Sequence, residues 1–130
     1  MDVARDMCRI TVDNAGERVR YFAAAPAETG KFEPLHVRDD LEWNAARQRE
    51  VLSEYDELLA KESYEEMMDA ENVNQIIKVA DAKILFTGFV EDLIVVASFE
   101  RGIFPVLDDI VEEFADYVRE HDVDFVALEA

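Results

Sequence analysis

The most constraining feature of the sequence is a pair of apolar segments, 83–89 and 93–99, which are separated by only three residues. Runs of this length that are rich in β-branched and aromatic residues predict strands, and so short a connection predicts a hairpin. The second segment, Leu-Ile-Val-Val-Ala-Ser-Phe, is almost continuously apolar, which is typical of a central strand covered on both faces. The fold must therefore supply packing layers on two sides of a sheet.

A helix and another hairpin are predicted ahead of these strands. The spacing of apolar residues over 2–11 predicts a short helix that stops near Gly16. Segments 19–24 and 32–38 are rich in β-forming residues, and the loop 26–30 between them completes an antiparallel hairpin.

A long helix is predicted directly after this hairpin. Alternation in the second strand places Leu35 and Val37 on one face and His36 on the other. Asp39 or Asp40 then caps the N-terminus of the helix.

The long helix carries an apolar stripe, and a capping box at Ser63 and Glu66 predicts that a new helix begins at an angle to it. Segment 73–77 is compatible with either helix or strand, because short apolar runs do not show a period. The positions assigned to the stripe are Leu41, Ala45, Val51, Leu52, Tyr55, Leu58 and Leu59.

A last helix is predicted after the central strand. Gly102 ends that strand, with an expected positive φ, and Pro105 suits the first turn of a helix. Asp108 and Asp109 are assigned to that first turn, where the helix dipole favours acidic groups. Segment 123–128 is open between an edge strand and a tail. The expected inward positions of the helix are Leu107, Ile110, Val111, Phe114 and Val118.

These elements predict one α+β domain over residues 1–130, a length typical of a single domain. We expect a four- or five-stranded antiparallel sheet with helices packed on it. The order of elements is similar to that of profilin-like, roadblock-type and sensor-type folds, a likeness that carries no function by itself.

The charge of the chain limits its environment and its partners. It has 13 basic and 31 acidic residues, and its formal net charge is −18 at pH 7. Such a surface repels itself in dilute salt and is stable near 1 M salt, where the Debye length is about 3 Å. We therefore expect a halophilic protein of a high-salt cytoplasm, with solvent cations on its acidic surface. A mesophilic protein with one basic partner is the alternative.

The charge and the absence of long apolar runs exclude several classes of partner and location. Phosphate contacts need clustered Lys and Arg, so we expect no direct binding of nucleic acid and no attraction to anionic membranes. No apolar run approaches the length of a membrane span, and no signal-peptide pattern opens the chain.

Recognisable catalytic patterns are absent from the sequence. It has no phosphate-binding glycine loop, no nucleophile elbow and no local metal-ligand pattern around His36 or His121. The single cysteine, Cys8, cannot form an intrachain disulfide, and we interpret it as a small core residue rather than a reactive thiolate. We expect no catalytic residues, no metal and no cofactor.

Four residues remain as candidates for binding a ligand or a partner. Arg38 could hold an anion or a partner carboxylate, and Asp39 could help to hold a cation; otherwise Arg38 pairs with a nearby acid and Asp39 caps the helix. Trp43 could mark a partner surface, since tryptophan is enriched at binding hot spots, or it could be half-buried. Arg101 could guard a ligand cleft at the end of the central strand, or it could be a solvated turn residue.

Two pairs of short segments resemble a family of small haloarchaeal domain proteins. The first pair is VRYF at 19–22 and LHVRDDL at 35–41, which resembles that family's VRY…VRDD hairpin motif. The second pair is FVEDLIVV at 89–96 and RGIFPV at 101–106, which is similar to its later strand and Arg-Gly turn. The sequence departs at His36, where the family tends to carry Tyr. The resemblance implies a stand-alone cytoplasmic domain of a halophile, with no activity or catalytic residue to carry over.

Three functional hypotheses follow. The first is a non-catalytic regulatory or scaffolding domain that acts through protein–protein contacts and forms a homodimer through an exposed sheet edge or the long helix. The second is a sensor domain that binds an anionic metabolite between sheet and helices, held by Arg38 or Arg101. The third is a small enzyme that uses Cys8, His36 or a pair of acids.

Overall fold

The computed structural model describes residues 2–52 and 75–122. Its centre is a five-stranded antiparallel sheet in the order β2-β1-β5-β4-β3. The sheet confirms the predicted α+β class. The strands are β1 (Val19–Pro26), β2 (Glu33–Val37), β3 (Gln75–Val79), β4 (Ile84–Val90) and β5 (Leu93–Phe99).

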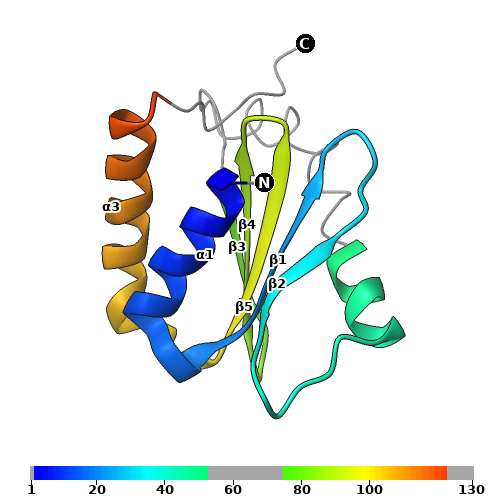
Figure 1. Ribbon diagram of the computed structural model, residues 1–130. Helices are drawn as coiled ribbons and strands as arrows, with labels where there is room; N and C mark the ends of the chain where they lie inside the picture. The colour runs from blue at the N-terminus through cyan, green and yellow to red at the C-terminus, as the bar shows by residue number, and fades with distance from the viewer. Residues whose placement is uncertain (1, 53–74, 123–130) are drawn as a thin grey trace, which may run out of the picture.

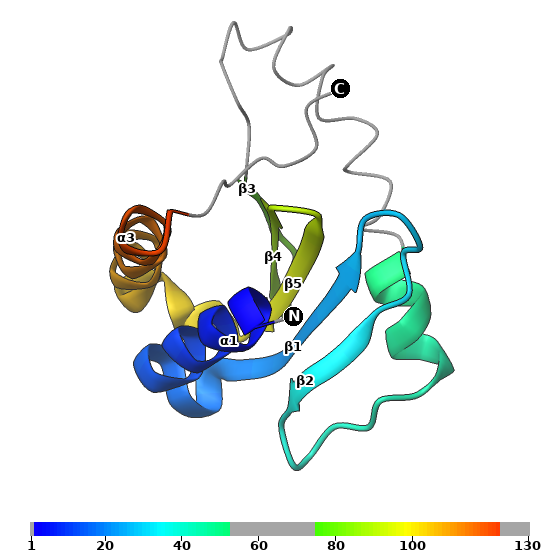
Figure 2. The same ribbon diagram turned by 45° about the horizontal axis from the view of Figure 1, so that its top comes forward.

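Helices lie on both sides of the sheet (Figure 1). The helices α1 (Asp2–Ala15) and α3 (Phe104–Glu120) pack side by side on one face, and a helix at residues 45–52 lies on the other. The turned view separates the same three layers (Figure 2). Within the described residues, no helix has the length and apolarity that a membrane crossing requires.

The predicted central strand is confirmed. All seven residues of β5 are buried, and the strand pairs with β1 on one side and β4 on the other. A two-residue turn joins β4 to β5, and within it Glu91 adopts a positive φ of 50°. The continuous apolar sequence of β5 is therefore explained by its burial on both faces of the sheet.

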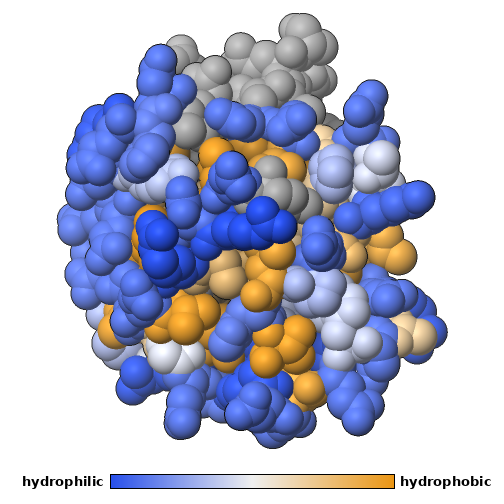
Figure 3. Space-filling view, viewed as in Figure 1, coloured by the Kyte–Doolittle hydropathy of each residue, from blue (hydrophilic) through white to orange (hydrophobic). Residues whose placement is uncertain are grey.

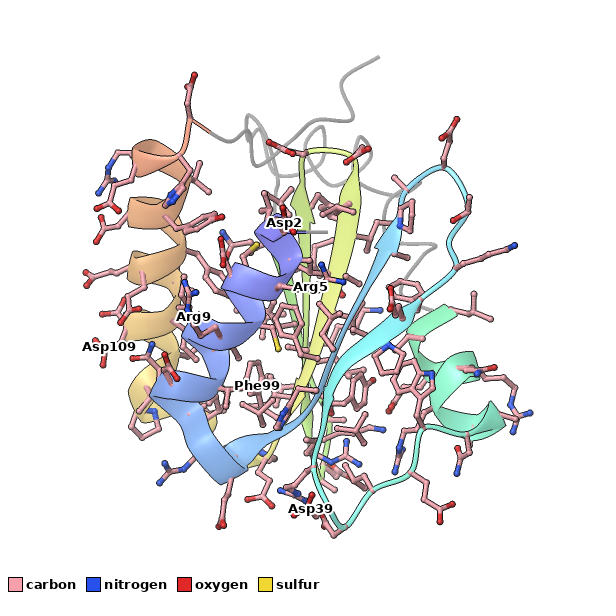
Figure 4. All side chains as sticks on the ribbon, viewed as in Figure 1. Asp2, Arg5, Arg9, Asp39, Phe99 and Asp109 are labelled. Carbon is pink, nitrogen blue, oxygen red and sulfur yellow. The ribbon has the colours of Figure 1, made fainter. Side chains whose placement is uncertain are left out.

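Each face of the sheet has its own core. On the α1/α3 side, Phe86 and Phe114 meet edge to face with ring centroids 6.0 Å apart, and Phe99 points from β5 into the space under α1 (Figure 4). Full burial of each such side chain contributes about 2–3 kcal/mol. The core on the opposite side consists of Tyr21, Ala23, Ala27, Val51, Phe89, Ile94 and Val96.

The first helix is longer than the predicted 2–11. Polar residues near its end are satisfied within the helix, because the Thr11 hydroxyl donates to the Met7 carbonyl and the Asn14 amide donates to the Ile10 carbonyl, both at 2.8 Å. The helix therefore continues to Ala15, and Gly16 follows with a φ of 55°.

The predicted alternation in β2 is wrong. Phe22 lies opposite His36, whereas the next residue of β1 lies opposite Pro34, which leaves Leu35 as an extra residue in β2. Such a bulge reverses the facing of the strand beyond it. Leu35 consequently packs against the α1/α3 core and Val37 against the opposite one.

The predicted start of the second helix is also wrong. Residues 39–40 form a turn, and the helix begins only at residue 45. Its cap is Asn44, whose Oδ1 accepts a hydrogen bond from the Arg47 backbone N–H at 3.1 Å. The inward residue is Val51, which is fully buried, whereas Leu52 from the same predicted stripe is 51% exposed.

Segment 75–79, left open by periodicity, is the strand β3. Segment 73–74, the second predicted helix start at Ser63, and the tail at 123–128 lie outside the described residues, as do the later positions of the apolar stripe.

The segment after β5 departs from prediction in two details. Gly102 lies in a 3₁₀ turn, Arg101–Ile103, and is not among the glycines with positive φ. Because α3 begins at Phe104, its first turn contains no acidic residue, and Asp108 and Asp109 come after it. Pro105 does occupy the start of the helix as predicted. Ile110 and Phe114 are buried as predicted, together with Tyr117.

Candidate functional site

A groove of about 970 Å³ opens where the C-terminal end of α1 meets the ends of β2 and β5. We call it the Arg38 groove. Its walls come from segments distant in sequence, including the 3₁₀ turn η1 (Gly16–Arg18) after α1. The lining residues are Val12, Ala15, Gly16, Glu17, Arg18, His36, Val37, Arg38, Asp39, Asp40 and Glu100.

Arg38 is the most highly connected polar residue of this groove. Its Nε and Nη2 donate to the two carboxylate oxygens of Asp40 at 2.5 and 3.0 Å. Its Nη1 donates to Glu100 at 2.6 Å and to the Glu17 carbonyl at 2.9 Å. The guanidinium thus ties the turn after β2 to the end of β5 and to the turn after α1.

These contacts set the protonation of the groups involved. The Arg38 guanidinium holds the pKa of Asp40 below its ordinary value, chiefly through the side-chain hydrogen bonds. In return, Asp40 and then Glu100 raise the pKa of Arg38. Asp40 and Arg38 therefore stay charged at neutral pH, and their ion pair persists there.

The charge of the groove bears on the sensor hypothesis. Its lining contains four carboxylates and two arginines, so its field is predominantly negative. An anionic ligand would have to replace Asp40 or Glu100 at the Arg38 guanidinium. Binding of an anion by Arg38 stays a prediction, and it requires that the anion displace one of these two carboxylates.

Of the four candidate residues, the structure brings only Arg38 and Asp39 together, in the Arg38 groove. Asp39 is exposed in the groove wall, at the tip of the turn and away from the start of the 45–52 helix (Figure 4). Trp43 is half-buried in the core on the opposite face of the sheet, edge to face with Tyr21 at a centroid distance of 5.6 Å. Arg101 is exposed after β5, where its Nη1 lies 3.5 Å from the Asp81 carbonyl oxygen.

Cys8 and His36, the residues of the enzyme hypothesis, are not arranged as a nucleophile and its base. Cys8 is buried in the α1/α3 core, and burial raises the pKa of its thiol to about 11. A thiol of this kind is almost entirely protonated at neutral pH and is therefore a poor nucleophile. His36 lines the Arg38 groove from β2, and Cys8 is not among the residues of that groove.

Carboxylates also gather on the outer side of α3. Asp108, Asp109 and Glu112 are exposed, with oxygen atoms within 4.8 Å of one another. Hydrophilic residues cover this side of the helix, and Asp109 points outward from it (Figures 3 and 4). In so acidic a chain we interpret them as a solvated face.

The edge strand β3 is the feature that sequence reasoning did not single out. In the described sheet it has one neighbour, β4. Ile77 and Val79, two positions apart, are 42% and 54% exposed. They lie opposite Phe86 and Ile84, two residues of the α1/α3 core, and so share that face at the margin of the sheet. The segment, Gln-Ile-Ile-Lys-Val, is short and does not alternate strictly between polar and apolar residues, so periodicity could not assign it to a strand.

Comparison with known proteins finds a likeness in structure only. No family model matches the sequence, and no curated protein matches it. MglB of Myxococcus xanthus has a similar structure, with a TM-score of 0.65 at 10% identity over 92% of this chain and 94% of that one. The gliding protein MglB of Thermus thermophilus gives a TM-score of 0.64 at 8% identity, over 87% of this chain and 83% of that one. At such identities the likeness establishes a shared roadblock-like fold.

Proposed function

We propose that this chain is a non-catalytic regulatory or scaffolding domain that acts through protein–protein contacts, and that two copies associate through β3. The observation that carries the proposal is the exposed apolar pair Ile77 and Val79, which lies on one face of β3 at the margin of the described sheet. A second copy that packs against this pair would remove its apolar surface from water.

The structural likeness supports the first part of this proposal. MglB of Thermus thermophilus is described as a gliding protein, which names a cellular process and no reaction. The buried, protonated thiol of Cys8 argues in the same direction, because the thiol-based enzyme hypothesis needs an accessible thiolate. We further propose that the domain works in a high-salt cytoplasm of a haloarchaeal type, where screening relieves its charge of −18.

The dimer is tested by light scattering coupled to size-exclusion chromatography in about 1 M KCl, where the Debye length is about 3 Å. We expect twice the monomer mass for the native chain and the monomer mass for the double variant Ile77→Lys, Val79→Lys. The control is Phe104→Lys, which alters a side chain that is 48% exposed at the start of α3. Leu52→Lys tests the helix as the alternative interface.

Three outcomes separate the interfaces. Loss of the dimer in the β3 variant alone supports an interface at Ile77 and Val79. Loss of the dimer in Leu52→Lys alone indicates that the interface lies on the 45–52 helix. A native chain that is strictly monomeric at micromolar concentration overturns the dimer, and the search for a partner then continues by pull-down in molar KCl.

The sensor domain is kept as a second candidate because the Arg38 groove is large enough for a small ligand. It predicts that one compound in a panel of nucleotides and metabolites raises the melting temperature, and that Arg38→Ala removes the increase. A panel without any such increase, or an increase that Arg38→Ala leaves intact, contradicts it.

A further inference from the structure

Three basic side chains converge on the face of the sheet that the 45–52 helix covers. They are Arg20 of β1, Arg47 of the helix and Lys83, which directly precedes β4. We call them the cationic cluster. In a chain with 13 basic and 31 acidic residues, such a grouping from three separate elements is unexpected.

Glu50 is the carboxylate that the described residues place among these cations. Its side chain is only 13% exposed, and it forms ion pairs with Lys83 and, at 3.6 Å, with Arg47. The Tyr21 hydroxyl donates to the same carboxylate at 2.8 Å. Glu50 therefore offsets part of the positive charge and orients two of the three cations.

Arg20 is left without an acidic partner among the described residues. Its Nη1 donates to the Ser98 hydroxyl at 2.7 Å, and that acceptor is neutral. A guanidinium offers five N–H donors, so most of its capacity is unused here. The nearby Asp40 is already held by two bonds to Arg38.

Among the residues that the structure describes, the cluster thus carries more positive than negative charge in a partly desolvated position. The side chains of Arg47 and Lys83 are 25% and 28% exposed. Burial first, and then the charge of the neighbouring cations, lowers the pKa of both Arg20 and Lys83. Like charges held together out of water are unfavourable, and a bound anion would relieve the repulsion.

We propose that Arg20, Arg47 and Lys83 form a binding site for an oxyanion, a phosphate or carboxylate group that takes up the unused donors of Arg20. Arginine forks bind such groups through two parallel hydrogen bonds, and lysine adds a point charge. The buried Ser98 hydroxyl accepts from Arg20 Nη1 and so holds the guanidinium in place. This site does not depend on the proposed dimer.

The test is a titration of the ¹⁵N-labelled native chain with inorganic phosphate, and separately with acetate, at ionic strength held constant with KCl. We expect saturable shifts of the side-chain N–H signals of Arg20 and Arg47. Arg20→Gln should weaken binding by at least about tenfold, a change of about 1.4 kcal/mol in binding free energy. Arg20→Gln leaves Glu50 its contacts with Lys83, Arg47 and Tyr21, so the fold should be retained.

The matched control is Arg5→Gln, which removes one positive charge from α1, where the Arg5 side chain is 59% exposed. The proposal is supported if Arg5→Gln binds like the native chain while Arg20→Gln does not. Saturation by phosphate alone identifies a phosphate site, and saturation by acetate identifies a carboxylate site. Shifts that do not saturate, or that are equal in the native chain and Arg20→Gln, overturn it.

Discussion

Arg38 and Asp40, two positions apart in the chain, form a bidentate ion pair with N–O distances of 2.5 and 3.0 Å. The pair closes the turn after β2 on itself. Because the same guanidinium also reaches Glu100 and the Glu17 carbonyl, it joins that turn to the ends of β5 and α1. A residue selected from the sequence as a possible ligand contact is therefore also a structural clamp.

Loss of this clamp should have a small but measurable effect on stability. The ion pairs of Arg38 are exposed to solvent, and pairs of this kind contribute at most about 1 kcal/mol each in dilute salt. We expect Arg38→Gln to lower the free energy of unfolding by about 1 kcal/mol in urea denaturation, and by less in molar KCl. Arg101→Gln, at an exposed site, should change it by less than about 0.5 kcal/mol. Equal effects of the two substitutions would contradict a clamp.

The cap of the second helix can be assigned by a pair of substitutions. Asn44→Ala removes the side-chain acceptor of the Arg47 N–H, and such changes cost about 1 kcal/mol. Asp39→Ala should leave the unfolding free energy nearly unchanged, since Asp39 lies in the turn and not at the helix start. Thermal or chemical denaturation measures both. A larger effect at Asp39 than at Asn44 would show that the helix starts earlier.

Tyr117 predicts a loss of stability at alkaline pH. Burial, together with the hydrogen bond that its hydroxyl donates to Asp6 at 2.5 Å, raises its pKa from 10.0 to about 12. Because the folded state binds this proton more tightly, the contribution is complete below pH 10 and is lost as the pH rises towards 12. We expect the unfolding free energy to decline across this interval, and to decline less steeply in Tyr117→Phe. Identical slopes for the two proteins would exclude Tyr117 as the cause.

Cys8 should be inert in the folded protein. Its thiol is 8% exposed, and burial raises its pKa from 9.0 to about 11. At pH 7–8 we expect a disulfide reagent to modify Cys8 only as fast as the protein unfolds, and Cys8→Ser to keep the oligomeric state of the native chain. Rapid modification under native conditions would restore the thiol-based enzyme hypothesis. Unfolding by urea provides the positive control, since the exposed thiol then reacts freely.

The parts of the fold that were predicted depend on local patterns. Burial of β5 on both faces follows from a continuous apolar run, and the inward face of α3 follows from the spacing of Ile110 and Phe114. Gly16 marks a helix end because glycine readily adopts a positive φ, and Pro105 marks a helix start because its ring fixes φ near the helical value. In each case the cause lies within a few residues of the effect.

The errors share a different origin. Leu35 faces away from Val37 because β1 pairs with β2 through a bulge, and no local pattern in β2 encodes the register of its neighbour. Asp39 and Asn44 are both suitable caps by residue type. The choice between them depends on where the turn after β2 is held, and Arg38 holds it by reaching Glu100 across the sheet.

Composition and periodicity predict the class of fold, the central strand and the acidic character of the surface, because these properties are set residue by residue. Which charges meet depends on how the elements pack together. Nothing in the sequence singles out Arg20, Arg47 and Lys83. They form a cluster because β1, the residue before β4 and the 45–52 helix bring their side chains together on one face of the sheet. The electrostatic energy of the cluster depends on the distances between its charges. These residues are far apart in the chain, so their spacing in the sequence does not specify those distances.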